Sequence, residues 1–417
     1  MTSIECREQT FVVRLENDTT AEYVLRGLND DEVKPWSEFC ASVFSYKKNP
    51  PSADYFYRHY ANDPTTKVPG SSKLIRVATF EGSIVAFCRV FLKQISTGNK
   101  HHDAPKSILS GGIGEVCTNI NHRRRGISKK LLQNAIVIME DRSEVQISSL
   151  HAAPTFFPLY ESLGYSAPPA SNPCAANRWS TVDFCWKPNR NNEILQNNPG
   201  IRIRSAEFPN DTKVLQRLHA KYSEEHLVGC ILRSEEYWNE YLSKELEGSL
   251  YVLESNGSSE SEEHQIVSWL SLGGTMDCFF VQEFGVDTSF FREQERDSIS
   301  MHWIVGTLIV SAIKAIVGVG ADSSPGNTIY STIKLPGFVS DKIGKCKNSP
   351  NELVTFDWKS EHTEIDRGWM YRGVGSNDDT ATVEFLNFLQ GISTTPIETH
   401  CSGHRQREHF VWPSDSF

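Results

Sequence analysis

A short basic segment of the chain, residues 123–128, has residue types suited to binding an anion. It reads Arg-Arg-Arg-Gly-Ile-Ser and lies between two segments with different patterns. Residues 113–118 are rich in β-branched side chains, which predicts a strand. Residues 129–139 carry apolar side chains at helical spacing, which predicts a helix. The basic segment is therefore expected to be a turn that leads from a strand into a helix.

Such a turn suits a diphosphate. The first turn of a helix has unpaired N–H groups at the positive end of the helix dipole, and these groups bind phosphate oxygens. Gly126 lets the backbone approach the anion without a Cβ in the way, and the three arginines add positive charge and donors. The segment has neither the Gly-Lys-Ser/Thr of a Walker loop nor the three spaced glycines of a dinucleotide fold. The diphosphate is therefore expected to belong to a different cofactor.

A second segment, residues 156–165, indicates which one. It reads Phe-Phe-Pro-Leu-Tyr-Glu-Ser-Leu-Gly-Tyr and follows residues 145–151, which alternate like a strand. Together the two segments resemble motifs of the GNAT superfamily of acetyl-CoA-dependent N-acetyltransferases. The family pattern Arg/Gln-x-x-Gly-x-Gly/Ala is matched from Arg123 to Ser128, where serine replaces the usual last residue. The later family pattern, Tyr-x-x-x-Gly-Phe/Tyr, is matched from Tyr160 onward.

The resemblance implies a fold and a cofactor. It implies an α+β chain with the GNAT fold, in which a mixed central sheet is flanked by helices. It also implies that acetyl-CoA is the co-substrate, with its acyl-pantetheine arm between the strands predicted at residues 113–118 and 145–151. Backbone N–H groups of the first strand would hold this arm and polarise the thioester carbonyl. The residues assigned to acetyl-CoA on this basis are Val116, Cys117, Thr118, Arg123, Arg124, Arg125, Gly126, Ile127, Ser128 and Lys129.

The reaction needs a base, because an alkylammonium group with a pKa near ~10.4 must lose a proton before it attacks a thioester. Glu115 is one candidate, since the family often uses a glutamate on this strand; an exposed carboxylate paired with a lysine is the alternative. His122 and His151 compete with it, because the pKa of histidine lies closer to neutral pH. The family motif assigns Tyr160 as the acid that protonates the leaving thiolate, and a core aromatic residue is the alternative.

The acceptor amine is expected beside residues 55–60, Tyr-Phe-Tyr-Arg-His-Tyr, where the family builds one wall of its acceptor site. Aromatic side chains suit an aliphatic amine or an ammonium group through cation–π contacts. The same segment equally fits a helix that packs against the core. Arylalkylamines, amino acids, aminoglycosides and peptides all remain open as acceptors. The formal net charge of −10 favours a cationic one.

The order of predicted elements repeats along the chain, which predicts two similar units. Residues 10–190 are expected to form the catalytic GNAT domain, closed by a strand at residues 178–186. Residues 200–375 are expected to form a degenerate GNAT-like α/β domain, closed by a strand at residues 368–374. Residues 376–417 are expected to form a C-terminal helix and a polar tail.

Other features of the sequence argue against further classes of partner. The net charge of −10 disfavours nucleic acid. Apolar residues 303–320 are interrupted by Lys314 and by glycines, so a buried helix is expected rather than a membrane span. The cysteines include no Cys-x-x-Cys pair, and Cys401, His404 and His409 match no zinc motif, so no metal is expected. The start of the chain is polar and acidic and lacks the apolar core of a signal peptide, which favours the cytosol.

These observations predict an enzyme that moves an acetyl group from acetyl-CoA to a primary amine of a small molecule by direct attack in a ternary complex. Acetylation of a protein or peptide lysine is one alternative. Binding of acyl-CoA without turnover, as in a sensor, is another. The second unit is expected to be structural or to shape the acceptor site, because it has no Arg-x-x-Gly-x-Gly and the acidic residues 288–295 would repel a diphosphate.

Overall fold

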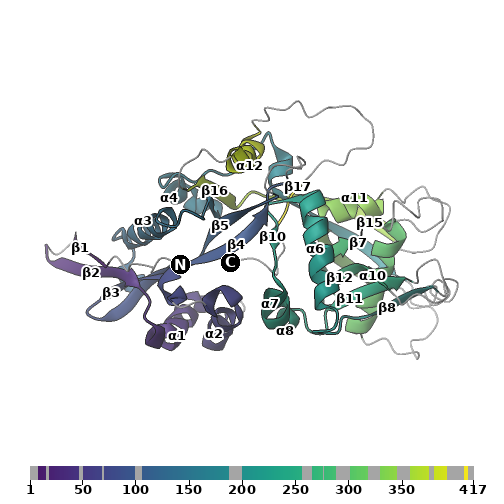
Figure 1. Ribbon diagram of the computed structural model, residues 1–417, viewed down its shortest axis with the longest axis horizontal. Coiled ribbons are helices and arrows are strands. Elements are labelled where there is room, and N and C mark those ends of the chain that lie inside the picture. Colours follow the sequence, from purple (N-terminus) through teal and green to yellow (C-terminus); the bar gives the residue numbers. More distant parts are fainter. Residues whose placement is uncertain are drawn as a thin grey trace. The chain divides into compact units, whose positions relative to one another are not determined.

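The computed structural model divides the chain into two compact units. Its described residues are 8–15, 18–46, 50–67, 70–98, 106–186, 200–255, 265–275, 277–287, 301–317, 329–344, 357–374, 380–391 and 408–411. The first unit is formed mainly by residues 1–170 and 367–399, and the second by residues 171–366 and 400–416. Figure 1 shows the helices and strands of both units.

The first unit is built on one mixed sheet with the strand order β1-β2-β3-β4-β5-β6-β16. The β5–β6 pair is parallel, and the other neighbours are antiparallel. The strands are β1 (Gln9–Arg14), β2 (Thr20–Gly27), β3 (Ile75–Phe80), β4 (Ser83–Ser96), β5 (Ser107–Thr118), β6 (Ile147–His151) and β16 (Trp369–Gly373). The α-helices are α1 (Val33–Val43), α2 (Ala53–Asn62), α3 (Ile127–Glu140), α4 (Phe157–Glu161) and α12 (Thr380–Gln390). Short 3-10 helices are η1 (Asp30–Glu32), η2 (Phe44–Tyr46), η3 (Pro64–Lys67), η4 (Ser71–Leu74), η5 (Ile120–His122) and η6 (Pro154–Phe156).

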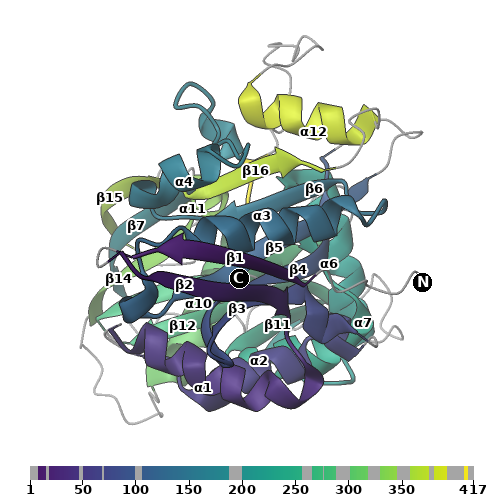
Figure 2. The same ribbon diagram turned by 90° about the vertical axis from the view of Figure 1, so that its left-hand side faces the viewer.

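Helices cover both faces of this sheet. Successive residues of a strand point to opposite faces, so neighbours on β4 pack against different helices. Phe87 of β4 packs with Trp36 of α1 in one buried cluster. Its neighbour Cys88 packs with Leu131 of α3 in another. Figure 2 shows α1 and α3 on opposite sides of the strands. The apolar residues that recur at helical spacing after residue 128 are thus the buried stripe of α3.

The second unit is built on a second mixed sheet with the strand order β15-β7-β14-β13-β12-β11-β8. Its β13–β14 pair is parallel, and the other neighbours are antiparallel. The strands are β7 (Asn177–Trp186), β8 (Ile201–Ser205), β11 (Leu250–Ser255), β12 (Gln265–Thr275), β13 (Cys278–Val286), β14 (Ile329–Pro336) and β15 (Asp357–Asp366). The helices are η7 (Pro173–Ala175), α6 (Thr212–His226), α7 (Glu235–Tyr237), η9 (Trp238–Leu242), α8 (Ser243–Glu245), α10 (Met301–Val317) and α11 (Gly337–Gly344). The short strands are β9 (Leu227–Val228), β10 (Ile231–Leu232) and β17 (Glu408–His409), of which β9 and β17 pair with each other.

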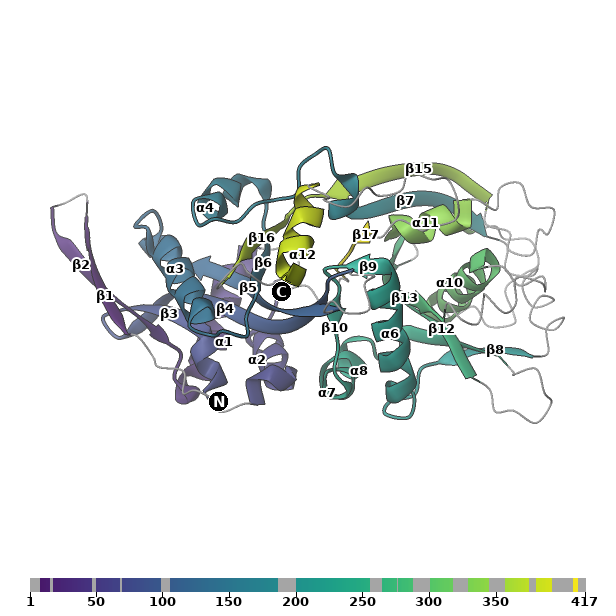
Figure 3. The same cartoon turned by 45° about the horizontal axis from the view of Figure 1, so that its top comes forward.

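The strands that close the two sheets differ from the prediction. Sequence order predicts that residues 178–186 close the first sheet and residues 368–374 the second. In the structure β7 pairs with β14 and β15 of the second sheet, whereas β16 pairs with β6 of the first. Figure 3 shows β7 beside β15 and β16 beside β6. A strand pattern does not identify its partner, because the hydrogen bonds of a sheet come from the backbone. The two closing strands are therefore exchanged relative to the prediction.

The same exchange moves the predicted domain boundaries. The first unit leaves off at residue 170 and resumes at residue 367, instead of spanning residues 10–190. The second unit accordingly begins before β7 and ends its main stretch at residue 366, instead of spanning residues 200–375. Each unit thus contains a strand that the order of elements along the chain assigns to the other.

Residues 376–417 are divided between the two units. The predicted helix is present as α12, and its Phe385 packs edge-on against Tyr371 of β16 in the first unit. Phe410, near the end of the chain, is buried in the core of the second unit. The described residues of the C-terminal segment therefore pack against both units, α12 against the first and Phe410 in the core of the second.

The remaining predictions concern segments outside the described residues, the apolar run near residue 310, and membrane and metal sites. Residues 288–295, Cys401 and His404 lie outside the described residues. The apolar run of the second unit forms α10, whose Ile304 and Leu308 are fully buried. No helix within the described ranges is both long and apolar enough to cross a bilayer. The same ranges contain no group of three or more His, Cys, Asp or Glu side chains arranged to bind a metal ion.

Candidate active site

The first sheet opens between its two parallel strands. Pairing of β5 with β6 runs from Ser110↔Ile147 to Ile113↔Leu150, and β6 ends one residue later. β5 continues to Thr118, where β4 is its partner. The edge of β5 that faces away from β4 therefore has no strand neighbour over its last residues. Backbone N–H and C=O groups on such an edge are available to a ligand.

A β-bulge lies in this part of β5. Phe87 of β4 pairs with Cys117, but Arg89 pairs with Gly114, so β5 carries one residue more than β4 between these pairs. Glu115 lies inside the bulge and has a φ of 54°, a left-handed conformation that is uncommon for a residue with a side chain. Bulges redirect side chains and are frequent beside active sites. The bulge sets the direction of the Glu115 side chain.

The turn after β5 ends in an exposed helix terminus. Gly126 is the N-cap residue of α3, has a φ of 72° and is exposed. A Cβ built on Gly126 would meet no atom within 4 Å, so the space beside the helix start is open. The first backbone hydrogen bond of the helix runs from Lys130 N to Gly126 O, and no side chain caps the terminus. The N–H groups of residues 127–129 thus face an open space, as an anion site requires.

The three arginines of the turn have different surroundings. Arg123 Nε donates a hydrogen bond to the Thr118 carbonyl oxygen at 3.1 Å. Arg125 Nη1 donates to the Tyr23 hydroxyl at 2.5 Å. Arg124 is exposed, has a φ of 62° and makes no side-chain hydrogen bond or ion pair with the described residues. Arg123 and Arg125 therefore brace the turn, and Arg124 is the arginine left available for an anion.

A hydroxyl pair ties the helix start to the splayed strand. Ser128 Oγ and Thr118 Oγ1 lie 2.8 Å apart. Serine at this position thus has a local use that glycine or alanine, the usual family residues, would not supply. Lys129 on the same turn is exposed. The residues predicted to bind acetyl-CoA accordingly lie on two connected features, the end of β5 and the start of α3.

Glu115 has two basic neighbours, of which His59 alone is within hydrogen-bond distance, and it keeps one oxygen unbonded. Its side chain is 6% exposed, and His59 Nδ1 of α2 lies 3.4 Å from Oε1. Arg89 Nη1 of β4 lies 3.9 Å from the same oxygen. The other oxygen, Oε2, is buried and has no hydrogen-bond partner among the described residues. Burying an unbonded carboxylate oxygen is costly, so the group suits a role that uses the free oxygen.

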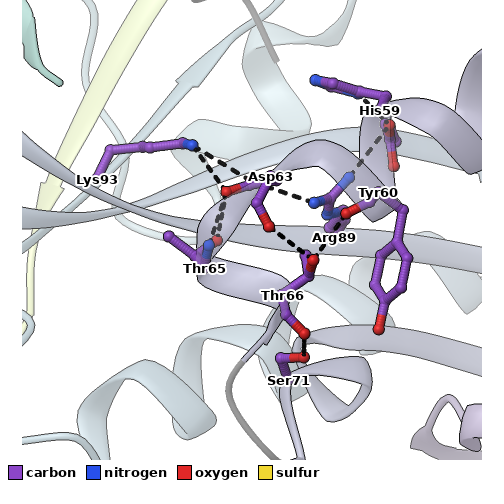
Figure 4. Close-up of polar contacts among 9 residues, drawn as sticks. His59, Tyr60, Asp63, Thr65, Thr66, Ser71, Arg89 and Lys93 are labelled. Atoms are coloured by element: carbon purple, nitrogen blue, oxygen red, sulfur yellow. Dashed lines mark hydrogen bonds and ion pairs between the residues drawn. The ribbon is translucent and has the colours of Figure 1, made fainter. Parts of the chain in front are cut away.

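A buried ion cluster lies next to this carboxylate. Asp63, which follows α2, accepts hydrogen bonds from Lys93 Nζ at 3.2 Å and from Arg89 Nη2 at 3.3 Å (Figure 4). Thr65 adds donors from its hydroxyl and its backbone N–H. Burial alone would raise the pKa of Asp63, but Lys93 and Arg89 outweigh burial and lower it. Asp63 is therefore a carboxylate that pairs with both basic side chains.

Aromatic rings fix the arginine of this cluster. The Arg89 guanidinium lies 4.2 Å from the centre of the Phe91 ring and 5.4 Å from that of Tyr60. Figure 4 shows Tyr60 beside Arg89 and Asp63. Contacts of this kind restrict the planar guanidinium as well as stabilise its charge. Arg89 is thus held between two carboxylates and two rings.

Tyr160 lies on α4 and is part of the buried apolar cluster of the first unit. It is 8% exposed, and burial, with a smaller contribution from Cys88, raises its pKa to about 12. No hydrogen bond to its hydroxyl is found in the described part of the chain. Tyr165, by contrast, shares a 2.6 Å hydrogen bond with Ser148. Tyr160 is thus a protonated donor without a committed partner, although no contact joins it to Glu115 within the described residues.

The two competing histidines have other neighbours. His151 ends β6, is exposed, and packs its ring 5.3 Å from that of Trp369 on β16. His122 lies in the basic turn, with its Nδ1 3.0 Å from the Tyr23 hydroxyl. Burial and the charge of Arg125 lower the pKa of His122. His122 is therefore part of the packing that supports the turn.

The expected acceptor wall is a helix with two faces. Phe56 of α2 is buried, whereas Tyr55 and Tyr57 are 41% and 47% exposed. The segment thus combines the core-packing and the surface interpretations. Its His59 is the residue that reaches Glu115, a contact that the sequence does not reveal. Sequence reasoning also missed Arg89 and Lys93 of β4, although two basic residues on one face of an otherwise apolar strand require a buried acid.

A family model described as an acetyltransferase (GNAT) domain matches residues 24–167, from β2 to just beyond α4. A GCN5-related N-acetyltransferase from Kribbella flavida has a TM-score of 0.50 at 16% identity, over 84% of this chain and 71% of that chain. A probable N-acyltransferase from Enterococcus faecalis has a TM-score of 0.52 at 12% identity, over 84% and 73%. A GCN5-related N-acetyltransferase from Anabaena variabilis has a TM-score of 0.50 at 12% identity, over 84% and 72%.

No curated protein matches the sequence of this chain. The solved structures share little sequence with it, so they establish a likeness of fold alone. That likeness agrees with the α+β class and the mixed sheet predicted from the sequence. The family model covers the basic turn and the aromatic helix, which the two motifs single out, and also the bulge of β5.

Proposed function

Because the first unit of this chain is a GNAT acetyltransferase domain, we propose that the protein moves the acetyl group of acetyl-CoA to a primary amine of a small molecule. The amine attacks the thioester directly while both substrates are bound. The observation that carries the proposal is Glu115, whose Oε2 is buried and unbonded at the bulge of β5. A positioned carboxylate with a free oxygen is suited to accept the proton that the amine must lose.

The binding of acetyl-CoA is assigned to the exposed start of α3 and to the free edge of β5. The open space beside Gly126 fits a diphosphate, which the N–H groups of residues 127–129 and the Arg124 side chain would hold. Backbone groups of residues 116–118 would hold the pantetheine arm. Arg123, Arg125 and Ser128 support these groups through the turn. Bound here, acetyl-CoA supplies the acetyl group and the thiolate that leaves.

Two side chains move protons in this proposal. Glu115 Oε2 accepts a proton from the attacking nitrogen as the new C–N bond forms. Tyr160 donates its hydroxyl proton to the sulfur as the C–S bond breaks. A pKa of about 12 keeps Tyr160 protonated at neutral pH, as an acid must be. His151 is the second candidate for the base.

The acceptor is proposed to be a cationic amine. Tyr55 and Tyr57 offer exposed rings on α2, the helix that also carries His59. The net charge of −10 attracts cations and repels nucleic acid. The free thiols of Cys40, Cys88 and Cys117 fit a reducing compartment such as the cytosol.

A thiol-release assay tests the proposal. The purified protein is mixed with acetyl-CoA and a panel of small amines, with a lysine peptide as a separate arm, and free CoA is measured. We expect thiol release with at least one small amine, and an acetylated product by mass spectrometry. Release with the peptide alone would favour a protein acetyltransferase. Binding of acetyl-CoA without release from any amine would indicate a sensor and contradict the proposal.

The cofactor site has its own test. Changing Arg124 to Glu and Gly126 to Val together removes the exposed charge and places a branched side chain at a φ of 72°. We expect isothermal calorimetry to detect no binding of acetyl-CoA to this variant. Arg202→Ala, at an exposed position of β8, is the matched loss of one arginine and should bind like the unmodified protein. Unchanged affinity in the double variant would refute the assigned site.

A further inference from the structure

We propose that His59 is a positioning residue, which holds Glu115 so that Oε2 faces the amine. This inference rests on the proposed function, in which Glu115 is the base. His59 Nδ1 lies 3.4 Å from Glu115 Oε1, and the two side chains are 11% and 6% exposed. The N–H at Nδ1 donates to Oε1. Because the donor engages one oxygen, the lone pairs of the other remain for the substrate.

Two basic side chains face Glu115, and His59 is the closer of them. Arg89 also faces Glu115, but its Nη1 is 3.9 Å from Oε1 and forms no hydrogen bond. Arg89 instead forms an ion pair with Asp63, at 3.3 Å from its Nη2. Lys93 pairs with the same carboxylate. Asp63 thus keeps the arginine from forming a tight ion pair with Glu115. A tight pair would occupy the carboxylate and weaken it as a base.

His59 is itself held in place by packing. Its ring stacks 6.0 Å from that of Tyr55 on the same helix and lies 5.8 Å from that of Phe91 on β4. Figure 4 shows His59 above Arg89, on the side away from Thr66 and Ser71. A donor fixed between two rings restricts the rotation of the carboxylate that it contacts. No bond to His59 forms or breaks in the reaction: the proton leaves the amine nitrogen and binds Oε2.

The titratable and charged groups around Glu115 come from four elements. They are His59 of α2, Arg89 of β4, Cys40 of α1 and Cys117 of β5, with Asp63 and Lys93 reaching it through Arg89. Burial, and then the charge of Glu115, raise the pKa of both thiols, so these are neutral at ordinary pH. Neither thiol therefore adds a charge beside Glu115.

Two substitutions at position 59 separate positioning from packing. His59→Phe keeps a ring between Tyr55 and Phe91 but removes the donor, and we expect kcat to fall roughly 10- to 100-fold with KM for acetyl-CoA within about twofold. The acidic limb of the kcat–pH profile should move to higher pH, because a donor favours the ionised form of a carboxylate. His59→Asn restores an N–H near the Nδ1 position. It should recover most of kcat and return the limb toward that of the unmodified protein.

A double-mutant cycle with Glu115→Gln completes the experiment. If His59 acts through Glu115, His59→Phe has no further effect on kcat in the Glu115→Gln background. An equal loss in both backgrounds would overturn the proposal, as would a pH profile that His59→Phe leaves unmoved. His362→Asn, on the exposed face of β15, is the control for a histidine change and should leave kcat unaltered. Failure of the proposed function is distinct: the unmodified protein then releases no thiol.

Discussion

The two units place a buried glutamate on the same kind of strand and use it differently. In each sheet a parallel strand pair separates after a few residues, and the first strand of the pair carries a bulge, at Glu115 in β5 and at Gln282 in β13. Glu283, next to the second bulge, forms a bidentate ion pair with Arg233 at 2.5 and 3.1 Å, and neither side chain is exposed. Glu115 has two longer contacts and one unbonded oxygen.

We propose that this difference separates a unit suited to chemistry from a unit suited to support. A carboxylate with both oxygens bonded to one buried guanidinium is committed to that partner, and releasing it to act as a base would leave a buried charge unpaired. A carboxylate whose counter-charge is shared with Asp63 keeps its second oxygen available. Partner geometry, rather than burial or residue type, separates the two glutamates. The second unit is accordingly proposed to be structural.

Matched substitutions of the two glutamates give the largest expected contrast. Glu115→Gln should lower kcat by about 10²–10⁴-fold, because glutamine cannot accept the proton, while the protein stays folded. Glu283→Gln should instead lower the free energy of unfolding by about 3–5 kcal/mol, because it removes the negative charge that the buried Arg233 meets in a bidentate pair. Steady-state kinetics and urea denaturation of both variants check this. Comparable losses of kcat per folded molecule in both would remove the distinction.

A second contrast lies within the first unit, between two neighbouring tyrosines. Tyr160→Phe removes the proposed acid, and kcat should fall roughly tenfold or more with unchanged affinity for acetyl-CoA. Tyr165→Phe removes the hydrogen bond to Ser148 and should cost about 1 kcal/mol of stability while sparing kcat. Kinetics and thermal denaturation distinguish the two. The acid assignment is mistaken if Tyr160→Phe turns over at the original rate.

Both units have an arginine–carboxylate ion pair before a helix, and we expect the two pairs to depend on pH in the same way. Arg26 pairs with Glu32 before α1, and Arg204 pairs with Asp211 before α6, both at 2.6 Å. The hydrogen bond from Arg26 lowers the pKa of Glu32, and Arg204 lowers that of Asp211 although burial alone would raise it. A lowered folded-state pKa adds stability that is present above the unfolded pKa, near ~4, and is lost as the pH falls through the folded value.

Substitution of Glu32 and Asp211 tests whether their lowered pKa values stabilise the fold. The effect expected is the smallest of those predicted. Glu32→Gln and Asp211→Asn should each lower the unfolding free energy at pH 7 by about 1 kcal/mol. The difference from the unmodified protein should shrink as the pH falls below about 4, because the original carboxylates take up protons as the pH falls through their lowered folded-state pKa values. Urea denaturation at pH 7, 5 and 3 measures it. A difference that is constant with pH would mean that the pairs act through packing.

The sequence predicts the local parts of the site because local patterns specify them. The strand, basic turn and helix around Gly126 lie within one short stretch, and each has its own periodicity or turn chemistry. The contact between His59 and Glu115 joins a helix to a strand 56 residues further along the chain. No residue pattern encodes such a pair, because the approach of α2 to β5 depends on how the sheet as a whole folds. The partners of β7 and β16 are hidden for the same reason.

The exchanged closing strands also bear on how the protein is made. While the chain emerges from the ribosome, β6 is complete at His151, but its antiparallel neighbour begins only at Trp369. At ~5–20 residues per second, synthesis of the stretch between them takes on the order of tens of seconds. Throughout that interval the nascent first sheet has an open edge, the kind of surface to which other chains add strands. The second sheet has no such interval, because all seven of its strands lie within residues 177–366.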